Sequence, residues 1–179
     1  MPIKIIRESE FSKMPWKNGG GSSYEIYRLP ATSDYWDFRV SIAEVNSDGP
    51  FSLFPNCERF LMLLSDNGMH LKSNELNHSL LKIYDHLYFS GDLKITASLE
   101  NGPNRDFNVI WNKDKFIVEI SIKTGAFQEN FEQMLLYAHN GEGSINGEKF
   151  TQGDAVLCKN QSASVNISGE ILLIKFRAS

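Results

Sequence analysis

The stretch Phe116-Ile117-Val118-Glu119-Ile120-Ser121-Ile122-Lys123 carries the clearest fold signal in this chain of 179 residues. Its even-numbered positions are all apolar, and polar side chains occupy Glu119, Ser121 and Lys123 between them. Alternation of this kind is typical of a β-strand that buries one face. The segment 38–42 repeats the pattern, with Phe, Val and Ile alternating with Arg and Ser.

Other segments extend this β pattern along the chain. Short apolar runs at 135–137, 155–157 and 171–174 are bounded by turn residues, and we expect buried strands there. Asn146-Gly147 predicts a type I′ hairpin, since both central positions of that turn need positive φ. Strands spaced about 8–12 residues apart favour an all-β sandwich or barrel.

Helical periodicity is weak throughout. We expect only short helical turns, within residues 8–14, 104–112 and 127–134. Residues 89–95 (FSGDLKI) also echo residues 151–157 (TQGDAVL), and this repetition indicates a duplicated jelly roll. The predicted fold is therefore all-β, with two related halves and few helical turns.

Composition excludes several classes of function. The apolar and charged fractions, 41% and 22%, are ordinary for a globular protein, and the net charge of −4 argues against a general nucleic-acid binder. No apolar run approaches the ~20 residues of a membrane span, and residues 1–8 lack the plan of a signal peptide. We therefore expect a cytoplasmic protein with no membrane partner. Cys57 and Cys158 offer no disulfide framework, and we expect both to be free thiols.

The segment Met14-Pro15-Trp16-Lys17-Asn18-Gly19-Gly20-Gly21 has the character of a ligand-binding loop. A Trp, a cation and an amide stand directly against three glycines, whose backbone can bend tightly. The lysine precedes the glycines and no helix follows, so neither a P-loop nor a dinucleotide fingerprint is present. The four histidines include no HxH spacing, so we expect no bound metal and no cofactor.

Four motifs now carry a family resemblance. PWKNGGGSSYEI (15–26), FRVSIAEVNSDGPFSLFPNCERFLMLL (38–64), FSGD (89–92) and GPNRDFNVI (102–110) resemble, in order and register, the HutD/Ves family of small bacterial proteins. The resemblance covers essentially residues 1–125, with a looser match to the end.

The resemblance implies a bicupin, a single unit over 1–179 with two β-barrel halves. The half over approximately 1–125 would bear the pocket motifs, and 126–179 would form the second half, with strands shared between them. Family members associated with histidine utilisation are thought to be regulators that bind a small metabolite, and N-formylglutamate is the proposed ligand.

The residues themselves favour a pocket for a carboxylate. Lys17, Arg39 and Arg59 are cations on or beside predicted strands, and a guanidinium can hold a carboxylate with two hydrogen bonds. Arg39 and Ser41 share one strand face, which is either solvated or aimed into a barrel lumen. The match of this run to a family motif favours the lumen. Asn108 would help to orient the ligand.

The remaining candidates differ in the roles that we expect for them. Trp16 either covers the ligand or anchors its loop, and Asn18 either contacts the ligand or caps the turn. Glu44, Asp92 and Asp106 would hold the basic residues in place as counter-charges. The full set of expected ligand-binding residues is Trp16, Lys17, Asn18, Arg39, Ser41, Glu44, Arg59, Asp92, Asp106 and Asn108.

Three functional hypotheses follow. The first is a sensor or regulator that binds a small carboxylate without metal. The second is a metal-free isomerase, lyase or hydrolase that uses Glu44 or Asp92 as its acid or base. The third is an interaction module whose pocket is vestigial. The chain has enough apolar β-surface for a homodimer, but its sequence contains no heptad or other interface pattern.

Overall fold

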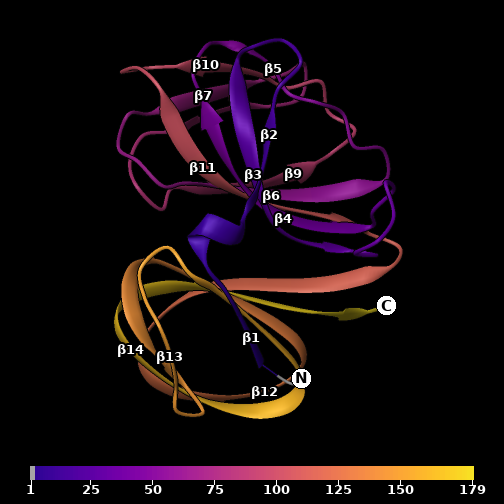
Figure 1. The fold of residues 1–179 in the computed structure, drawn as a ribbon. Helices are drawn as coiled ribbons and strands as arrows, with labels where there is room; N and C mark the ends of the chain where they lie inside the picture. The colour runs from indigo at the N-terminus through magenta and orange to yellow at the C-terminus, as the bar shows by residue number, and fades with distance from the viewer. Residues whose placement is uncertain (1–2) are drawn as a thin grey trace. The chain divides into compact units, whose positions relative to one another are not determined.

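The computed structural model describes residues 3–179, apart from the side chain of Gln161; Met1 and Pro2, which begin the N-terminal segment considered above, lie outside the described residues. The described chain is almost entirely β, with a single 3₁₀ turn at Glu8–Glu10 (Figure 1). It divides into two compact units. We call Ser12–Lys115 the central unit, and the residues up to Phe11 together with Phe116–Ser179 the terminal unit. No helix in the described part of the chain is long and apolar enough to cross a membrane.

The central unit contains two antiparallel sheets. The larger has six strands in the order β2 (Ser12–Pro15), β3 (Gly21–Leu29), β4 (Phe38–Val45), β11 (Asn104–Asn112), β6 (Cys57–Leu63) and β9 (His86–Ser90). The smaller has four, in the order β5 (Gly49–Pro50), β10 (Thr96–Leu99), β7 (Met69–Lys72) and β8 (Asn77–Leu80).

Strand register sets the inner face of the larger sheet. Across β4, β11 and β6, one row of neighbours is Arg39, Ile110 and Arg59. The next two rows are Ser41–Asn108–Leu61 and Ala43–Asp106–Leu63. Directly opposed residues of paired strands point to the same side of a sheet. This face therefore combines polar side chains with apolar ones that belong to the core of the central unit, which also includes Met69, Leu71, Ile95 and Ala97.

The terminal unit is one sheet in the order β1 (Ile3–Ile6), β14 (Ala155–Ala178), β12 (Phe116–Ile145) and β13 (Glu148–Phe150). The two long strands curl, and Leu135 of β12 pairs with both Leu157 and Ile174 of β14. This double pairing encloses a second apolar core, in which Met134, Leu136, Val156 and Leu173 are almost fully buried. β12 runs through residues 125 and 126, where the sequence led us to expect a division between halves.

Most of the predicted strands are present. Residues 38–42, 116–123, 135–137, 155–157 and 171–174 all lie in strands. The hairpin prediction is also confirmed, because Asn146 and Gly147 have φ of 47° and 88° between β12 and β13.

Two of the predicted helical turns are wrong. Residues 104–112 form β11 and residues 127–134 lie within β12. In β11, polar and apolar residues alternate only from Asp106 to Val109, and the apolar run 109–111 interrupts the pattern because both faces of the strand are buried there. In β12, Phe127 and Phe131 have helical spacing, but alternate residues from 127 to 133 are half-buried while those between them are exposed. Of residues 8–14, only Glu8–Glu10 are helical.

The two Gly-Asp pairs of the sequence echo are not structurally equivalent. Gly153 has φ of 89°, and Asp154 is only 4% exposed. The Asp154 carboxylate accepts hydrogen bonds from the backbone N–H of Thr151 at 2.9 Å and from its hydroxyl at 3.0 Å, and pairs with Arg7. Asp92, in contrast, is exposed.

We expect Asp154→Ala to lower the free energy of unfolding by about 1–2 kcal/mol, because it removes the buried carboxylate that accepts from Thr151 at this turn and pairs with Arg7. The matched Asp92→Ala change should stay within about 0.5 kcal/mol of the wild type. Urea unfolding followed by circular dichroism measures both. Equal stabilities for the two variants would contradict the structural difference between the two turns.

Candidate functional site

The central unit contains a cavity of about 860 Å³. Its lining draws on β4, β6 and β11, on the loop 14–18 and on residues 50–54. The lining includes eight of the ten residues singled out from the sequence: Trp16, Lys17, Asn18, Arg39, Ser41, Arg59, Asp106 and Asn108.

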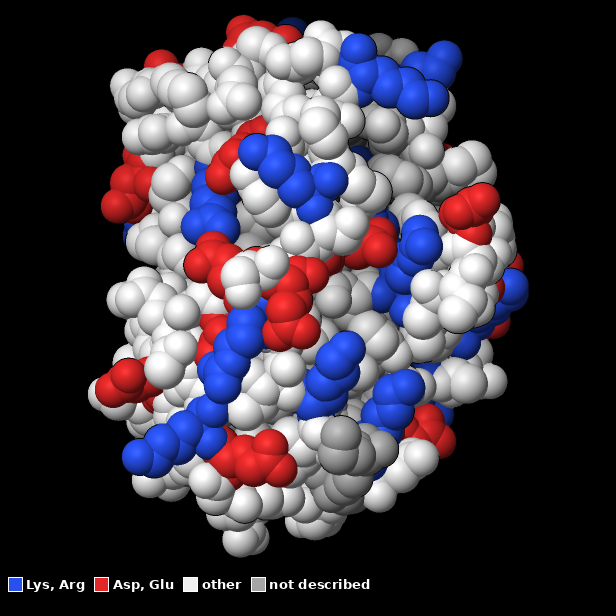
Figure 2. Space-filling view, in the orientation of Figure 1, with Lys and Arg blue, Asp and Glu red and all other residues white. Residues whose placement is uncertain are grey.

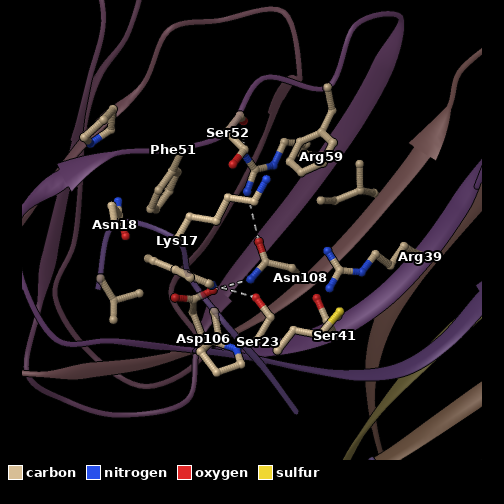
Figure 3. Close-up of a pocket in the computed structure, with 18 of the residues that line it drawn as sticks. Lys17, Asn18, Ser23, Arg39, Ser41, Phe51, Ser52, Arg59, Asp106 and Asn108 are labelled. Atoms are coloured by element: carbon tan, nitrogen blue, oxygen red, sulfur yellow. Dashed lines mark hydrogen bonds between the residues drawn. The ribbon is translucent and has the colours of Figure 1, made fainter. Parts of the chain in front are cut away.

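The wall of the cavity is the inner face of the larger sheet. Arg39 and Ser41 lie on the same face of β4, and that face lines the cavity. Arg39 and Arg59 flank Ile110 from either side. Neighbouring strands are ~5 Å apart, so the backbones of the two arginines are separated by about 10 Å. Figure 3 shows both guanidinium groups with Asn108 between them.

Arg59 is unusually buried for a cation, with only 6% of its surface exposed. Its guanidinium carbon lies 5.0–5.3 Å from the ring centres of Phe51, Phe54 and Phe89. It donates to the Asn108 side-chain oxygen at 3.2 Å and to the Ser52 carbonyl at 3.4 Å, while Nε has no partner among the described residues. Burial lowers the pKa of Arg59 to about 10. The side chain is therefore charged at neutral pH.

Asp106 lies in the same wall and is only 1% exposed. Its Oδ1 accepts a hydrogen bond from Nδ2 of Asn108. Within the described chain Oδ2 has no hydrogen-bond partner. Burial raises the pKa of Asp106 to about 7, against the opposing effects of the Asn108 hydrogen bond and the Arg59 charge. Asn108 thus links a buried cation to a buried carboxyl, as the dashed lines in Figure 3 show.

The charge of Arg39 is balanced in a different way, by an ion pair with Glu25. Its Nε donates to Glu25 Oε2 at 2.9 Å, and its guanidinium carbon lies 5.6 Å from the ring centre of Trp36. Glu25 lies on β3, directly opposite Ser41. Because the ion pair uses Nε, the two terminal nitrogens of Arg39 have no hydrogen bond to the described residues and can take a ligand.

The loop 16–21 forms one side of the cavity. Trp16 donates from Nε1 to the Ser23 hydroxyl at 2.9 Å, which anchors its ring. Asn18 Oδ1 accepts from the Gly20 N–H at 2.9 Å, and Gly19 has φ of 74°, so Asn18 caps the turn. Lys17 is exposed, and in Figure 3 its side chain extends over the pocket.

Glu44 and Asp92 do not line this cavity. Glu44 is five residues from Arg39, an odd separation, and alternation along β4 turns it to the opposite face. There it accepts a hydrogen bond from the Tyr24 hydroxyl at 2.9 Å. Asp92 accepts from the Asn56 N–H at 3.3 Å and lines a separate cavity. The expectation that both carboxylates serve the pocket cations does not match this placement.

Several lining residues were not singled out from the sequence. Residues 51–54 belong to one of the family motifs, and Phe51, Ser52 and Phe54 of this segment all line the cavity. No sequence signal pointed to Asp34 or Trp36, which lie in the loop between β3 and β4. Among the described residues, no three or more His, Cys, Asp or Glu side chains gather as a metal site would require.

Burial also shapes the chemistry of the cysteines. Cys57 and Cys158 are both free and buried. Burial raises the pKa of the Cys57 thiol and raises that of Cys158 to about 12. Neither thiol lines the cavity.

Several curated proteins are related to this chain in sequence. An uncharacterised 21.2 kDa protein of the hutC 3′ region in Pseudomonas putida is 33% identical over 115 residues, which are 64% of this chain and 60% of that protein. Protein Ves of Citrobacter koseri is 32% identical over 123 residues, 66% of this chain and 64% of that protein. The aligned part of the chain thus spans less than two thirds of the length of these relatives.

Solved structures extend the similarity to the whole chain. The structure of HutD from Pseudomonas fluorescens SBW25, in a formate condition, is 28% identical, with a TM-score of 0.89 and 99% of each chain covered. A cupin 2 conserved barrel domain protein from Leptotrichia buccalis shares the fold alone, with a TM-score of 0.60 at 12% identity over 97% of this chain and 96% of that one. The prediction of an all-β, cupin-like jelly roll is confirmed; its duplication into two barrels stays a prediction.

A family model agrees with these similarities. The HutD model matches residues 8–174, which include every residue of the cavity lining. The chain therefore belongs to the HutD family.

Proposed function

We propose that the protein binds a small carboxylate metabolite in this pocket, without metal, and acts as a cytoplasmic sensor or regulator. N-formylglutamate is the ligand that we propose to test first. The observation that carries the proposal is Arg59, a buried cation in the pocket wall whose immediate neighbours leave its charge incompletely balanced. A carboxylate supplies the opposite charge and matches guanidinium geometry.

The charges around the cavity favour an anion. Lys17, Arg39 and Arg59 line it, against two carboxyl groups, Asp34 and Asp106. With its pKa at about 7, Asp106 is charged in only about half of the molecules at neutral pH. Glu25 offsets part of the Arg39 charge. The remaining surplus of positive charge suits an anionic ligand.

The size of the cavity and the outer surface support a small ligand. A volume of about 860 Å³ lies within the usual ~300–1,000 Å³ of small-molecule sites. On the face shown in Figure 2, basic and acidic side chains are interspersed. A polyanion such as nucleic acid needs a basic patch or stripe, which this face does not provide.

The name of one relative supports a place in histidine utilisation. The Pseudomonas putida protein takes its description from the hutC region, which supports a connection with histidine utilisation. We propose that ligand occupancy either alters a partner or withdraws metabolite from the free pool. The enzymatic alternative lacks comparable support, because Glu44 and Asp92 lie outside the cavity lining.

We expect N-formylglutamate or a related carboxylate to raise the melting temperature of the protein. A ligand that binds only the folded state stabilises it by ~2.7 kcal/mol at a hundredfold excess over Kd. A thermal-shift titration should include N-formylglutamate, formate, glutamate, urocanate and histidine. Formamide serves as a control of formate size without the charge, and it should give no shift.

Cooperative melting with no shift from any of these carboxylates would refute the proposal. An equal shift from formate and formamide would also count against it, because the pocket would then not be selecting for charge.

A further inference from the structure

We propose that Asp106 is protonated when the carboxylate ligand is bound. Its Oδ2 then donates a hydrogen bond to a ligand oxygen, so that binding takes up one proton. This inference rests on the proposed function and specifies how the site distinguishes and regulates its ligand. It changes the role of Asp106 from a counter-charge for the cations to a donor that touches the ligand.

The hydrogen bonds around Asp106 define which oxygen is available. Asn108 donates to Oδ1 through its NH₂ group, and its own oxygen accepts from Arg59. Asn108 cannot turn over, because its NH₂ group would then face the N–H donors of Arg59. Oδ1 is therefore occupied, and Oδ2 is the free end of the carboxyl group.

Oδ2 is also buried, and Asp106 is one of the residues that line the cavity. A buried oxygen without a partner destabilises the protein by ~1–3 kcal/mol, so a ligand that satisfies it gains affinity. The nearby indole donor of Trp16 is already used by Ser23. A ligand carboxylate offers only acceptors, and two carboxylate oxygens can lie in contact only when one of them carries a proton.

Charged groups from several neighbouring elements line the cavity around Asp106. Arg59 projects from β6, Arg39 from β4, and Lys17 and Asp34 from the loops that line the cavity. On β11 itself, the other polar side chains of the inner face are the neutral amides Asn104, Asn108 and Asn112.

Burial outweighs the cationic groups and sets the pKa of Asp106 at about 7 in the free protein. A bound anion adds a like charge beside the carboxyl and raises this pKa further. Well below pH 7, Asp106 is already neutral, so binding takes up no proton and the affinity does not depend on pH. Above pH 7, each binding event takes up a proton, and Kd rises about tenfold per pH unit until the pKa of the complex is reached.

Calorimetric titration tests this directly. N-formylglutamate and formate are each titrated at about pH 5.5, 7 and 8.5, where their carboxyls remain ionised, in pairs of buffers that differ in ionisation enthalpy. For the wild type we expect proton uptake close to zero at the lowest pH, rising toward one at the highest.

Two variants make the test specific. Asp106→Asn keeps the acceptor for Asn108 and places an N–H donor where the protonated Oδ2 would lie. It should bind within about threefold of the wild-type affinity at the lowest pH, with no proton uptake and no fall in affinity at higher pH. Asp92→Asn, which changes an exposed carboxyl outside the lining of this cavity, should keep the wild-type proton uptake.

The outcomes separate this inference from the function on which it rests. Wild-type binding without proton uptake at the highest pH would overturn the role of Asp106 and leave carboxylate binding intact. The role of Asp106 would also be overturned, with carboxylate binding left intact, by a folded Asp106→Asn variant that binds a hundredfold more weakly than the wild type at the lowest pH. If the wild type binds no carboxylate at any of these pH values, both the role of Asp106 and the proposed function would be overturned.

Discussion

Replacing Arg59 with methionine is expected to weaken the binding of N-formylglutamate at least a hundredfold at about pH 6, where Asp106 is mostly neutral. A guanidinium that holds a carboxylate with two charge-assisted hydrogen bonds contributes ~1.5–3 kcal/mol through each of them. Losing about 3 kcal/mol corresponds to a hundredfold change in Kd. Lys17 and Arg39 remain in the lining but cannot replace a donor fixed between Asn108 and three aromatic rings.

The same change should leave the protein folded. Methionine can fill the space between Phe51, Phe54 and Phe89, and its sulfur makes favourable contacts with aromatic rings. Without the Arg59 charge the pKa of Asp106 rises further above 7, so this buried carboxyl stays neutral at pH 6. We therefore expect the free energy of unfolding to change by less than about 1.5 kcal/mol.

Calorimetry at pH 6 measures the affinity, and a thermal melt of the free protein checks the fold. Arg177→Met is the matched control, because Arg177 is exposed on β14 in the terminal unit and lies outside the cavity lining. It should bind as the wild type does. If a folded Arg59→Met protein binds N-formylglutamate with wild-type affinity, the ligand does not contact Arg59.

The sequence alone was sufficient to predict the strands in which apolar side chains lie on one face and polar side chains on the other. That is why residues 38–42 and 116–123 were predicted correctly, and why Arg39 and Ser41 could be placed together. The same reasoning, extended three residues along β4, would have excluded Glu44, since an odd separation turns a side chain to the other face. Glu44 was included in the predicted site as a counter-charge for the basic residues, although alternation along β4 argued against it.

Other features depend on pairing between distant segments and have no local signal. The row Arg39–Ile110–Arg59 exists because β11 pairs with both β4 and β6. β11 was read as a helical turn because its inner face carries Asp106 and Asn108, polar residues that are buried in this fold. A polar residue in a sequence is ordinarily expected at the surface. Sites built from buried polar groups are for this reason the hardest to locate by periodicity.

Replacing Gly21 with alanine is expected to lower the free energy of unfolding of the central unit by about 3 kcal/mol, because a Cβ at this position would lie 2.2 Å from the Glu44 carbonyl oxygen. That oxygen belongs to the backbone of β4, in the residue before Val45, which is the ladder partner of Gly21, and it cannot rotate away. A loss of this size lowers the melting temperature by about 6–12 °C in a protein of this length. The three tryptophans all lie in the central unit, so their fluorescence follows its unfolding.

Gly49→Ala provides the matched control within the same unit. No atom lies within 4 Å of a Cβ at Gly49, and its φ is not in the left-handed region, so we expect a change within about 0.5 kcal/mol. A Cβ at Gly21 would also lie 3.1 Å from the Trp16 ring. Removing that ring with Trp16→Ala tests which contact matters. If the backbone clash dominates, Gly21→Ala destabilises the Trp16→Ala protein by nearly the same amount as the wild type. If most of the loss disappears, the ring is the obstacle, and the Gly21 position is needed for Trp16 to pack against the loop that lines the pocket.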